Sequence, residues 1–434
     1  MPPSSLNLRI ATSLADIDPA AWDSCANPEN SFSEKDLGGD AHSAGFALPP
    51  GCGSGDGAAS APATANRSTV HVFDEHEREP FNPFIAHAFL RSLEESGSVG
   101  RRTGWAPAYL VAEQGGRLVG AAPSYLKSHS QGEYVFDHGW ADAYERAGGS
   151  YYPKLQVAAP FTPATGRRLL VAPGADPTIR DALIAGLAGL CRQTKASSVH
   201  VTFPDRADWD ALGAAGFLQR TGQQFHFLNE GYGAFDDFLA ALASRKRKAI
   251  RRERKDAVAA GVEIHRLTGR DLREEHWDAF WTFYMDTGSR KWGRPYLTRA
   301  FFSHLGASMP DRVLLVMARR AGRWIAGALN LIGDHALYGR NWGSIEDHPF
   351  LHFEVCYYQA IEFAIERGLR RVEAGAQGEH KLSRGYRPVT TYSAHHFDDP
   401  AMRRAVADFL KRERRHVDAA IEMYGEHVPF RKDG

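Results

Sequence analysis

The sequence is poor in cysteine, in long apolar runs and in net charge, and each shortage narrows its possible functions. Its 434 residues include four scattered cysteines without a CxxC pair, which is typical of a reducing compartment and argues against structural disulfides or zinc. No stretch approaches the roughly 18 continuous apolar residues that a membrane span requires. The 52 lysines and arginines balance the 52 aspartates and glutamates, so no overall field favours nucleic acid or an acidic substrate.

Leader and catalytic motifs are also missing. The amino-terminal stretch lacks a basic region followed by an apolar core, so we expect no signal peptide and a cytoplasmic protein. There is no GxSxG elbow and no cysteine with an obvious base, so we expect no covalent nucleophile. The pairs His348–His352 and His395–His396 come without a carboxylate motif, and Pro349 interrupts helical geometry in the first pair. We therefore expect no metal site.

What the sequence does contain is an internal repeat. Four pairs of similar segments occur in the same order: 10–22 with 264–277, 83–89 with 295–301, 108–126 with 312–332, and 134–140 with 337–343. A repeat of this length indicates a duplicated domain rather than a solenoid, whose units are only tens of residues long. In such a protein we expect the site in the cleft between the two copies.

We predict a first domain over residues 1–230 and a second over 231–434. The first contains a Gly- and Pro-rich insertion at about 31–80 that the second lacks. This insertion has too little apolar area to offset its ordering entropy, so we expect a disordered loop. Elsewhere each half reads as helix, hairpin, further strands, helix and strand. The predicted fold class is α/β (α+β), each half a mixed, mostly antiparallel sheet flanked by helices.

A basic helix is predicted at 245–260, where the two halves meet. Its run 245–255 carries eight basic residues and one acidic residue. Arg247, Lys248 and Arg251 are our candidates for binding the phosphate groups of a nucleotide, a tRNA or a lipid headgroup. A solvated face or a hinge between the copies explains the same charge run, and both interpretations stay open.

Three further stretches, 127–170, 247–264 and 375–396, carry a resemblance to a known family. Together with the paired hairpins they cover nearly all of the chain outside the insertion. On these residues the chain resembles the FemAB-like branch of the GNAT acyltransferase superfamily, which is related to the peptidoglycan aminoacyltransferases. The resemblance implies two tandem GNAT-like domains. It is specific for the family but does not identify a substrate.

The resemblance also implies a reaction, in which an amine attacks an acyl group activated as a CoA thioester or an aminoacyl-tRNA ester. In the Fem enzymes a late Phe-Lys-x-x-Phe segment approaches the substrates, and its lysine matches Lys381 here. His380 and Arg384 stand in place of the two phenylalanines. The usual GNAT pyrophosphate motif ahead of a helix is missing from both halves. The donor therefore stays open between acyl-CoA and aminoacyl-tRNA.

Aminolysis requires a base for the amine, a stabilised oxyanion and reactants held together. Asp137 and His138, expected at a strand end, are candidates for proton handling, because a carboxylate can orient and tune an imidazole. A hydrogen-bonded pair that fixes the following turn explains them equally well.

A second polar group is predicted in a glycine-bracketed loop. It contains His380, Lys381, Arg384 and Tyr386, and glycines at both ends allow close approach to a ligand. A plain surface loop is the alternative. We expect His380 and Lys381 to be catalytic and the other two to bind substrate.

Four more residues complete the candidate site. Tyr151 and Lys154 are expected to line an acceptor pocket, although tyrosines are as often packing residues. Trp342 and Glu354 are placed in the matching cleft of the second copy, and Glu354 is equally explained as a favourable charge in the first turn of a helix.

The sequence therefore predicts an N-acyltransferase whose donor and amine acceptor, a small molecule or a peptide, meet between two GNAT-like domains. One alternative is a Fem-type, aminoacyl-tRNA-dependent enzyme acting on a cell-wall precursor. The other is a non-catalytic protein that binds RNA or anionic lipid through the basic helix.

Overall fold

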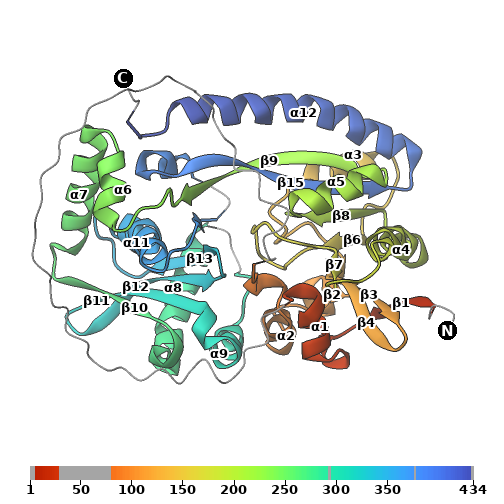
Figure 1. Cartoon of the computed structure of the whole chain (residues 1–434), viewed down its shortest axis with the longest axis horizontal. Coiled ribbons are helices and arrows are strands. Elements are labelled where there is room, and N and C mark those ends of the chain that lie inside the picture. Colours follow the sequence, from red (N-terminus) through yellow and green to blue (C-terminus); the bar gives the residue numbers. More distant parts are fainter. Residues whose placement is uncertain (1–4, 29–79, 292–294, 376–377, 432–434) are drawn as a thin grey trace, which may run out of the picture.

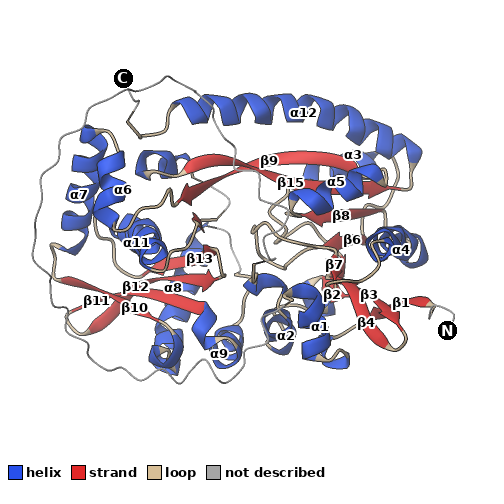
Figure 2. Cartoon of the chain, viewed as in Figure 1, coloured by secondary structure: helices blue, strands red, loops and turns tan. Residues whose placement is uncertain are grey.

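The computed structural model describes residues 5–28, 80–291, 295–375 and 378–431, and these form two sheets covered by helices (Figures 1 and 2). The predicted insertion at about 31–80 lies outside the described residues except for Pro80. The smaller sheet contains, in order, β1 (Leu6–Ala11), β3 (Tyr109–Gln114), β4 (Arg117–Ala122) and β7 (Leu170–Val171).

The larger sheet has 11 strands and runs through both halves of the chain. Its strands are, in order, β10 (Val262–Leu267), β11 (Val313–Arg320), β12 (Arg323–Ile332), β13 (Ala336–Ser344), β14 (Arg371–Glu373), β9 (Leu218–Leu228), β15 (Arg387–Phe397), β8 (Ser198–Thr202), β6 (Lys154–Val157), β5 (Ser124–Lys127) and β2 (Trp105–Pro107). Within it, β13 pairs parallel with β14 and β6 with β8, and the other pairings are antiparallel. The predicted fold class, α/β with mixed, mostly antiparallel sheets, is confirmed.

Helices cover both faces of this arrangement. The α-helices are α1 (Pro19–Ala26), α2 (His87–Glu95), α3 (His138–Arg146), α4 (Thr178–Thr194), α5 (Arg206–Ala214), α6 (Phe235–Ala241), α7 (Ser244–Val258), α8 (Glu274–Lys291), α9 (Arg299–Ser308), α10 (Leu351–Phe353), α11 (Gln359–Glu366) and α12 (Pro400–Glu426). A π-helical turn, η7 (Glu354–Tyr358), joins α10 to α11. The 3-10 turns are Leu14–Asp16, Pro83–Ile85, Arg101–Thr103, Gly269–Asp271, Pro310–Arg312 and η8 (Glu379–Arg384). No described helix is both long and apolar enough to cross a membrane.

The two halves exchange strands at the centre of the large sheet. Strand β9 precedes the predicted boundary at 230/231, yet it lies between β14 and β15 of the second half. Strand β15 in turn lies between β9 and β8, so it completes the sheet of the first half. Helix α12 runs along this central pair in Figure 1. The domain boundary stays a prediction, and the sheet is continuous across it.

The repeat is visible in matching elements. Hairpin β3–β4 corresponds to β11–β12, and both hairpins shift register at the same aligned place, after Ala112 and after Ala318. Helices α2 and α9, from the second pair of similar segments, pack on each other, with the rings of Phe89 and Phe301 5.9 Å apart. A bulge changes the bend and twist of a strand locally, so its position is a specific feature of a hairpin. The same position in both hairpins therefore supports a duplication.

One proposed repeat match is wrong. Segment 134–140 is a loop followed by the first turn of α3, whereas 337–343 lies within β13. The first-half strand placed like β13 is β6, which pairs antiparallel with the preceding strand and parallel with β8. The match rested on aromatic and glycine residues, which serve a helix start in one copy and a strand in the other.

Candidate active site

The strands β13 and β14 separate where the two halves meet. They pair over Ala336–Tyr338 and Arg371–Glu373, after which β13 continues to Ser344 alongside β12 and the chain after Glu373 turns away. Gly375 (φ 78°) and Gly378 (φ 115°) have positive φ angles, which glycine adopts without steric cost. The separation brings side chains from β9, β14 and η8 together. We call Gln224, His226, Arg371, Glu373 and Lys381 the junction cluster.

Glu373 is the unusual member of the junction cluster. Its side chain is 3% exposed, and Oε1 accepts a hydrogen bond from Nε of Arg371 at 2.8 Å. The other oxygen, Oε2, is buried without a hydrogen-bond partner among the described residues and lies 3.9 Å from Nε2 of His226. A buried carboxylate oxygen that makes no hydrogen bond is costly, and such groups are concentrated at functional sites.

The turn η8 supplies the lysine of the junction cluster. Lys381 is 1% exposed, and its Nζ donates a hydrogen bond to the carbonyl of Gly375 at 2.8 Å. Burial lowers the pKa of Lys381 to about 8. Its neighbour His380 is exposed, and its Nε2 is 2.8 Å from the hydroxyl of Tyr357. The two predicted catalytic residues of this loop therefore lie on one turn, one facing inward and one outward.

Helix α7 holds this turn in place. The Arg384 guanidinium forms hydrogen bonds with both carboxylate oxygens of Glu253 at 3.0 Å and stacks 3.4 Å from the ring centroid of Phe353. Glu354 is buried and accepts hydrogen bonds from Arg254, the shortest at 3.0 Å. Glu354 thus anchors the basic helix, and the described residues do not place its side chain in the predicted cleft.

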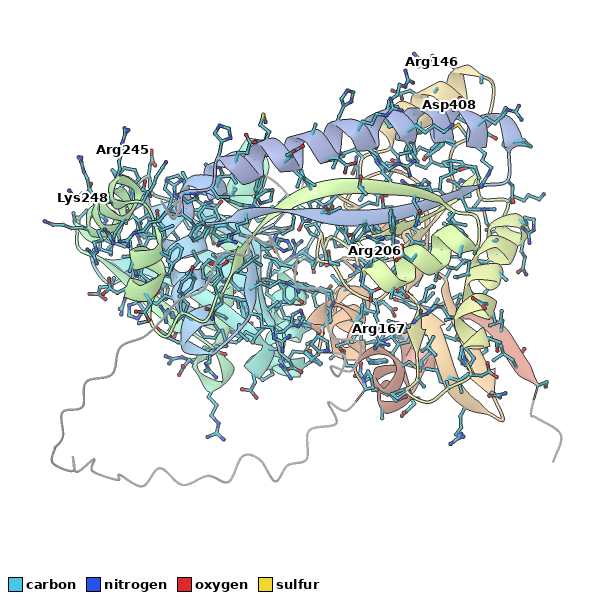
Figure 3. The ribbon with its side chains drawn as sticks, turned by 45° about the horizontal axis from the view of Figure 1, so that its top comes forward. Arg146, Arg167, Arg206, Arg245, Lys248 and Asp408 are labelled. Carbon is cyan, nitrogen blue, oxygen red and sulfur yellow. The ribbon has the colours of Figure 1, made fainter. Side chains whose placement is uncertain are left out.

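The predicted basic helix 245–260 is present as α7, but its charges divide between two faces. Arg251 pairs with the exposed Asp236 at 2.9 Å. The side chains of Arg247 and Lys248 form no hydrogen bond or ion pair among the described residues, and the same holds for the side chain of Arg245. In Figure 3 the labelled Arg245 and Lys248 project outward from the end of the molecule. The first turn of α7 therefore presents unpaired cations to solvent.

Asp137, Tyr151 and Lys154 do come together, but in the interior of the first half. Lys154 Nζ lies 2.5 Å from Oδ2 of Asp137, and the Tyr151 hydroxyl donates to the same oxygen at 2.8 Å. Burial alone would raise the pKa of Asp137, but the adjacent Lys154 ammonium outweighs it and holds the pKa well below its usual range. Asp137 also precedes α3 instead of ending a strand, so that part of the prediction is wrong.

This interior group continues as a hydrogen-bonded chain that we call the histidine relay. The Tyr151 hydroxyl lies 3.3 Å from Nε2 of His200. Nδ1 of His200 lies 2.7 Å from Nδ1 of His395, whose Nε2 lies 3.0 Å from the hydroxyl of Ser393. Burial lowers the pKa of His200 to about 3 and that of His395 well below its usual value.

The remaining predicted residues lie apart. His138 is exposed and stacks on Phe136 instead of bonding to Asp137. Trp342 contacts the ring of His352 at 5.1 Å, beside the outer side of the η8 turn. Tyr386 is fully buried, and its hydroxyl has no hydrogen-bond partner among the described residues. The predicted residues therefore lie in three regions, at the η8 turn, at helix α7 and in the first half, and not in one cleft.

Sequence reasoning missed His226, Gln224 and the role of Glu373. The signal available was alternation in β9, where Gln224 and His226 alternate with the buried Phe225 and Phe227. Polar residues on the inner face of a buried strand need partners, and those partners come from the other half of the chain.

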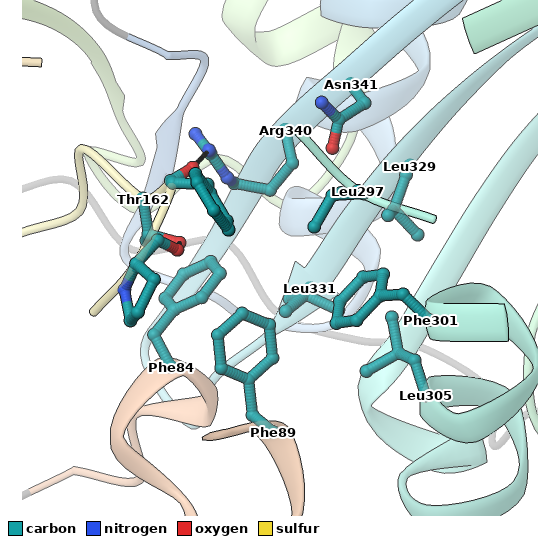
Figure 4. Close-up of a pocket in the computed structure, with 12 residues that line it drawn as sticks. Phe84, Phe89, Thr162, Leu297, Phe301, Leu305, Leu329, Leu331, Arg340 and Asn341 are labelled. Atoms are coloured by element: carbon teal, nitrogen blue, oxygen red, sulfur yellow. Dashed lines mark hydrogen bonds between the residues drawn. The ribbon is translucent and has the colours of Figure 1, made fainter. Parts of the chain in front are cut away.

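A small apolar cavity lies next to this junction, between the halves (Figure 4). Phe84 and Phe89 line it from the first half, and Phe301 and Leu305 from the second. Arg340, on the part of β13 that has separated from β14, lies at its polar side and donates to the Phe161 carbonyl. Across the described residues, no group of His, Cys, Asp or Glu is arranged to hold a metal ion.

Comparison with known proteins agrees with the resemblance noted in the sequence. Residues 69–432 match the FemAB-like family, described as peptidoglycan biosynthesis/recognition, so the chain belongs to that family. A search of curated proteins finds no match.

Solved structures similar to this chain include three of low sequence identity. FemX has 12% identity and a TM-score of 0.46, with 74% of this chain and 97% of FemX covered. L-PGS from Bacillus licheniformis has 12% identity and a TM-score of 0.46, with 78% and 99% covered. A tandem GNAT protein from the clavulanic acid biosynthesis pathway has 13% identity and a TM-score of 0.41, with 91% and 99% covered.

Proposed function

We propose that this protein transfers an acyl or aminoacyl group from an activated ester or thioester to an amine at the junction cluster. Membership of the FemAB-like family supports a transferase. The observation that carries the proposal is the buried Glu373 carboxylate, whose Oε2 has no hydrogen-bond partner among the described residues and lies 3.9 Å from Nε2 of His226, where β13 and β14 separate. Titratable groups of shifted pKa gathered at a junction of two halves are typical of active sites.

Each group has a role in aminolysis. Lys381, with its pKa of about 8, is mostly protonated at neutral pH, so its ammonium can stabilise the oxyanion of the tetrahedral intermediate. Glu373 would hold the incoming amine by accepting its hydrogen bond at Oε2. His380 would take part in catalysis from the exposed side of the same turn. The Glu253–Arg384 pair keeps that turn in position. We assign Asp137, Tyr151 and Lys154 to holding the first half together.

The unpaired cations of α7 are proposed to bind donor phosphates. Arg245, Arg247 and Lys248 lie on the helix that also carries Glu253, so donor binding would be coupled to the η8 turn. Either an acyl-CoA or an aminoacyl-tRNA offers suitable phosphates, and the acceptor would be a small molecule or a peptide amine. A Fem-type reaction on a cell-wall precursor falls within this proposal, whereas a non-catalytic RNA- or lipid-binding protein would need α7 alone.

The donor can be identified by thermal shift. Wild type and an Arg245→Ala/Arg247→Ala/Lys248→Ala variant are titrated with CoA, acetyl-CoA, palmitoyl-CoA and total aminoacylated tRNA. A ligand present at about 100 times its Kd stabilises the fold by about 2.7 kcal/mol, which the α7 variant should lose. Exposed Arg404 and Arg412 on α12 provide the control, and their replacement by alanine should leave the shift unchanged. A donor that binds but is never consumed with any amine would support the non-catalytic alternative.

A further inference from the structure

The imidazole of His226 is held in one tautomer by its neighbours. Nε2 of Gln224 donates to the carbonyl of Pro163 at 2.7 Å, and a carbonyl can only accept. The amide oxygen of Gln224 therefore faces Nε2 of His226 at 3.1 Å, so this nitrogen carries the proton. In a neutral imidazole Nδ1 then has a lone pair, and Nδ1 has no hydrogen bond within the described part of the chain.

Burial and the cations around His226 keep this ring neutral at physiological pH. Burial lowers the pKa of His226 to about 4, with Arg371 on β14 and Lys381 on η8 acting in the same direction. Glu373 opposes them from β14, with Oε2 3.9 Å from the protonated Nε2. On β15 the residue paired with His226 is Arg387, which is engaged by Glu230 at 2.8 Å.

We propose that Nδ1 of His226 accepts the proton of the attacking amine during acyl transfer, with Glu373 stabilising the imidazolium that forms. This inference rests on the proposed function. The amine nitrogen bonds to the acyl carbon and forms a tetrahedral intermediate. Its N–H proton moves to Nδ1, the C–O or C–S bond of the donor breaks, and the imidazolium returns the proton to the leaving oxygen or sulfur.

A weak base is sufficient for this step. The nitrogen in the tetrahedral intermediate is positively charged and far more acidic than a free alkylammonium ion, so an imidazole of lowered basicity can still deprotonate it. Gln224 and the Pro163 carbonyl act as positioning groups, because they fix the tautomer that places the lone pair on Nδ1. The base would then come from β9 of the first half, and Lys381 from the second half.

The tautomer can be tested without any substrate. In the full chain labelled with 15N-histidine, long-range proton–nitrogen correlation spectra distinguish the two neutral tautomers and the imidazolium. His226 is assigned as the signal absent from a His226→Gln variant. We expect the Nε2–H tautomer at pH 7, replaced by a mixture in a Gln224→Leu variant. An Nδ1–H tautomer or an imidazolium at pH 7 would overturn the proposal.

Turnover provides the second test. Consumption of acetyl-CoA or total aminoacylated tRNA is measured with a panel of primary amines for wild type, His226→Gln and the exposed-residue control His416→Gln. We expect kcat to fall at least about 100-fold in His226→Gln, with KM little changed and the control unaffected. An unchanged kcat in His226→Gln beside an active wild type would overturn the inference. A wild type that consumes neither donor would instead overturn the proposed function.

Discussion

Acid should unfold this protein through its buried histidines. His200, His226 and His395 are each at most 6% exposed, and burial lowers all three pKa values, to about 3 for His200 and about 4 for His226. These rings stay neutral in the folded state but take up protons in the unfolded chain below its pKa of about 6.5. At these three sites the unfolded state thus binds more protons, so the stability that the three rings contribute is complete above pH 6.5 and is lost as the pH falls below it.

The size of this loss of stability follows from the pKa values of the three histidines. Each such histidine costs about 1.4 kcal/mol per pH unit below 6.5, hence about 2 kcal/mol at pH 5. Three of them sum to about 6 kcal/mol, a large part of the roughly 5–15 kcal/mol that stabilises a typical protein. The depressed pKa of Asp137 contributes no slope in this window, because a carboxylate in the unfolded chain is also ionised above about pH 5.

Urea unfolding followed by tryptophan fluorescence at pH 7.5, 6.5, 5.5 and 5.0 measures this slope. A His395→Gln variant retains hydrogen-bonding capacity but cannot titrate, so it should lose about a third of the pH dependence between 6.5 and 5.0. A change of under about 1 kcal/mol between pH 7.5 and 5.0 in the wild type would refute the reasoning. It would mean that the three rings take up protons in the folded state as readily as in the unfolded one.

Two further predictions concern stability. Asp137→Ala would leave the buried Lys154 with Glu133, 3.3 Å away, as its only carboxylate partner among the described residues. It should lower the unfolding free energy by about 3 kcal/mol, against under about 1 kcal/mol for Asp210→Ala in an exposed pair, and equal losses in urea titrations would contradict this. Between the halves, a double-mutant cycle on Phe89 and Phe301 should give a coupling of about 0.5–1.5 kcal/mol, and a value near zero would mean that α2 and α9 stabilise the protein independently.

Local features of the fold were predictable from sequence and non-local ones were not. The hairpins and α7 follow from short-range patterns, and they appear where the sequence places them. The exchange of β9 and β15 depends on pairings such as His226 with Glu373, about 150 residues apart, which no window of sequence contains. The sheet order, and with it the junction cluster, had to come from the structure.

In the candidate site, too, the local features were predictable from sequence and the non-local contacts were not. The loop residues His380 and Lys381 were identified from their glycine-bracketed, polar segment, and they do lie on one turn. The pairing of Asp137 with His138 failed because successive residues at a helix start point in different directions, so adjacency in sequence gave no contact. The tertiary fold instead brings Asp137 to Tyr151 and to Lys154 at the start of β6.

The duplication also favours one of two equivalent histidine positions as the active one. His395 on β15 pairs with His200 on β8, just as His226 on β9 pairs with Glu373 on β14. In each copy the residue two positions earlier on the same strand contacts Nε2 of the histidine: Ser393 at 3.0 Å in one and Gln224 at 3.1 Å in the other.

The two copies differ at the other ring nitrogen. Nδ1 of His395 is bound to His200 inside the histidine relay, which leaves it no lone pair for a substrate. Nδ1 of His226 has no such partner in the described structure, and a carboxylate replaces the second histidine beside it. A base that serves a substrate needs an unoccupied lone pair, and a neighbouring carboxylate stabilises its protonated form. We therefore expect the site around His226 to serve acyl transfer and the histidine relay around His395 to be a structural support.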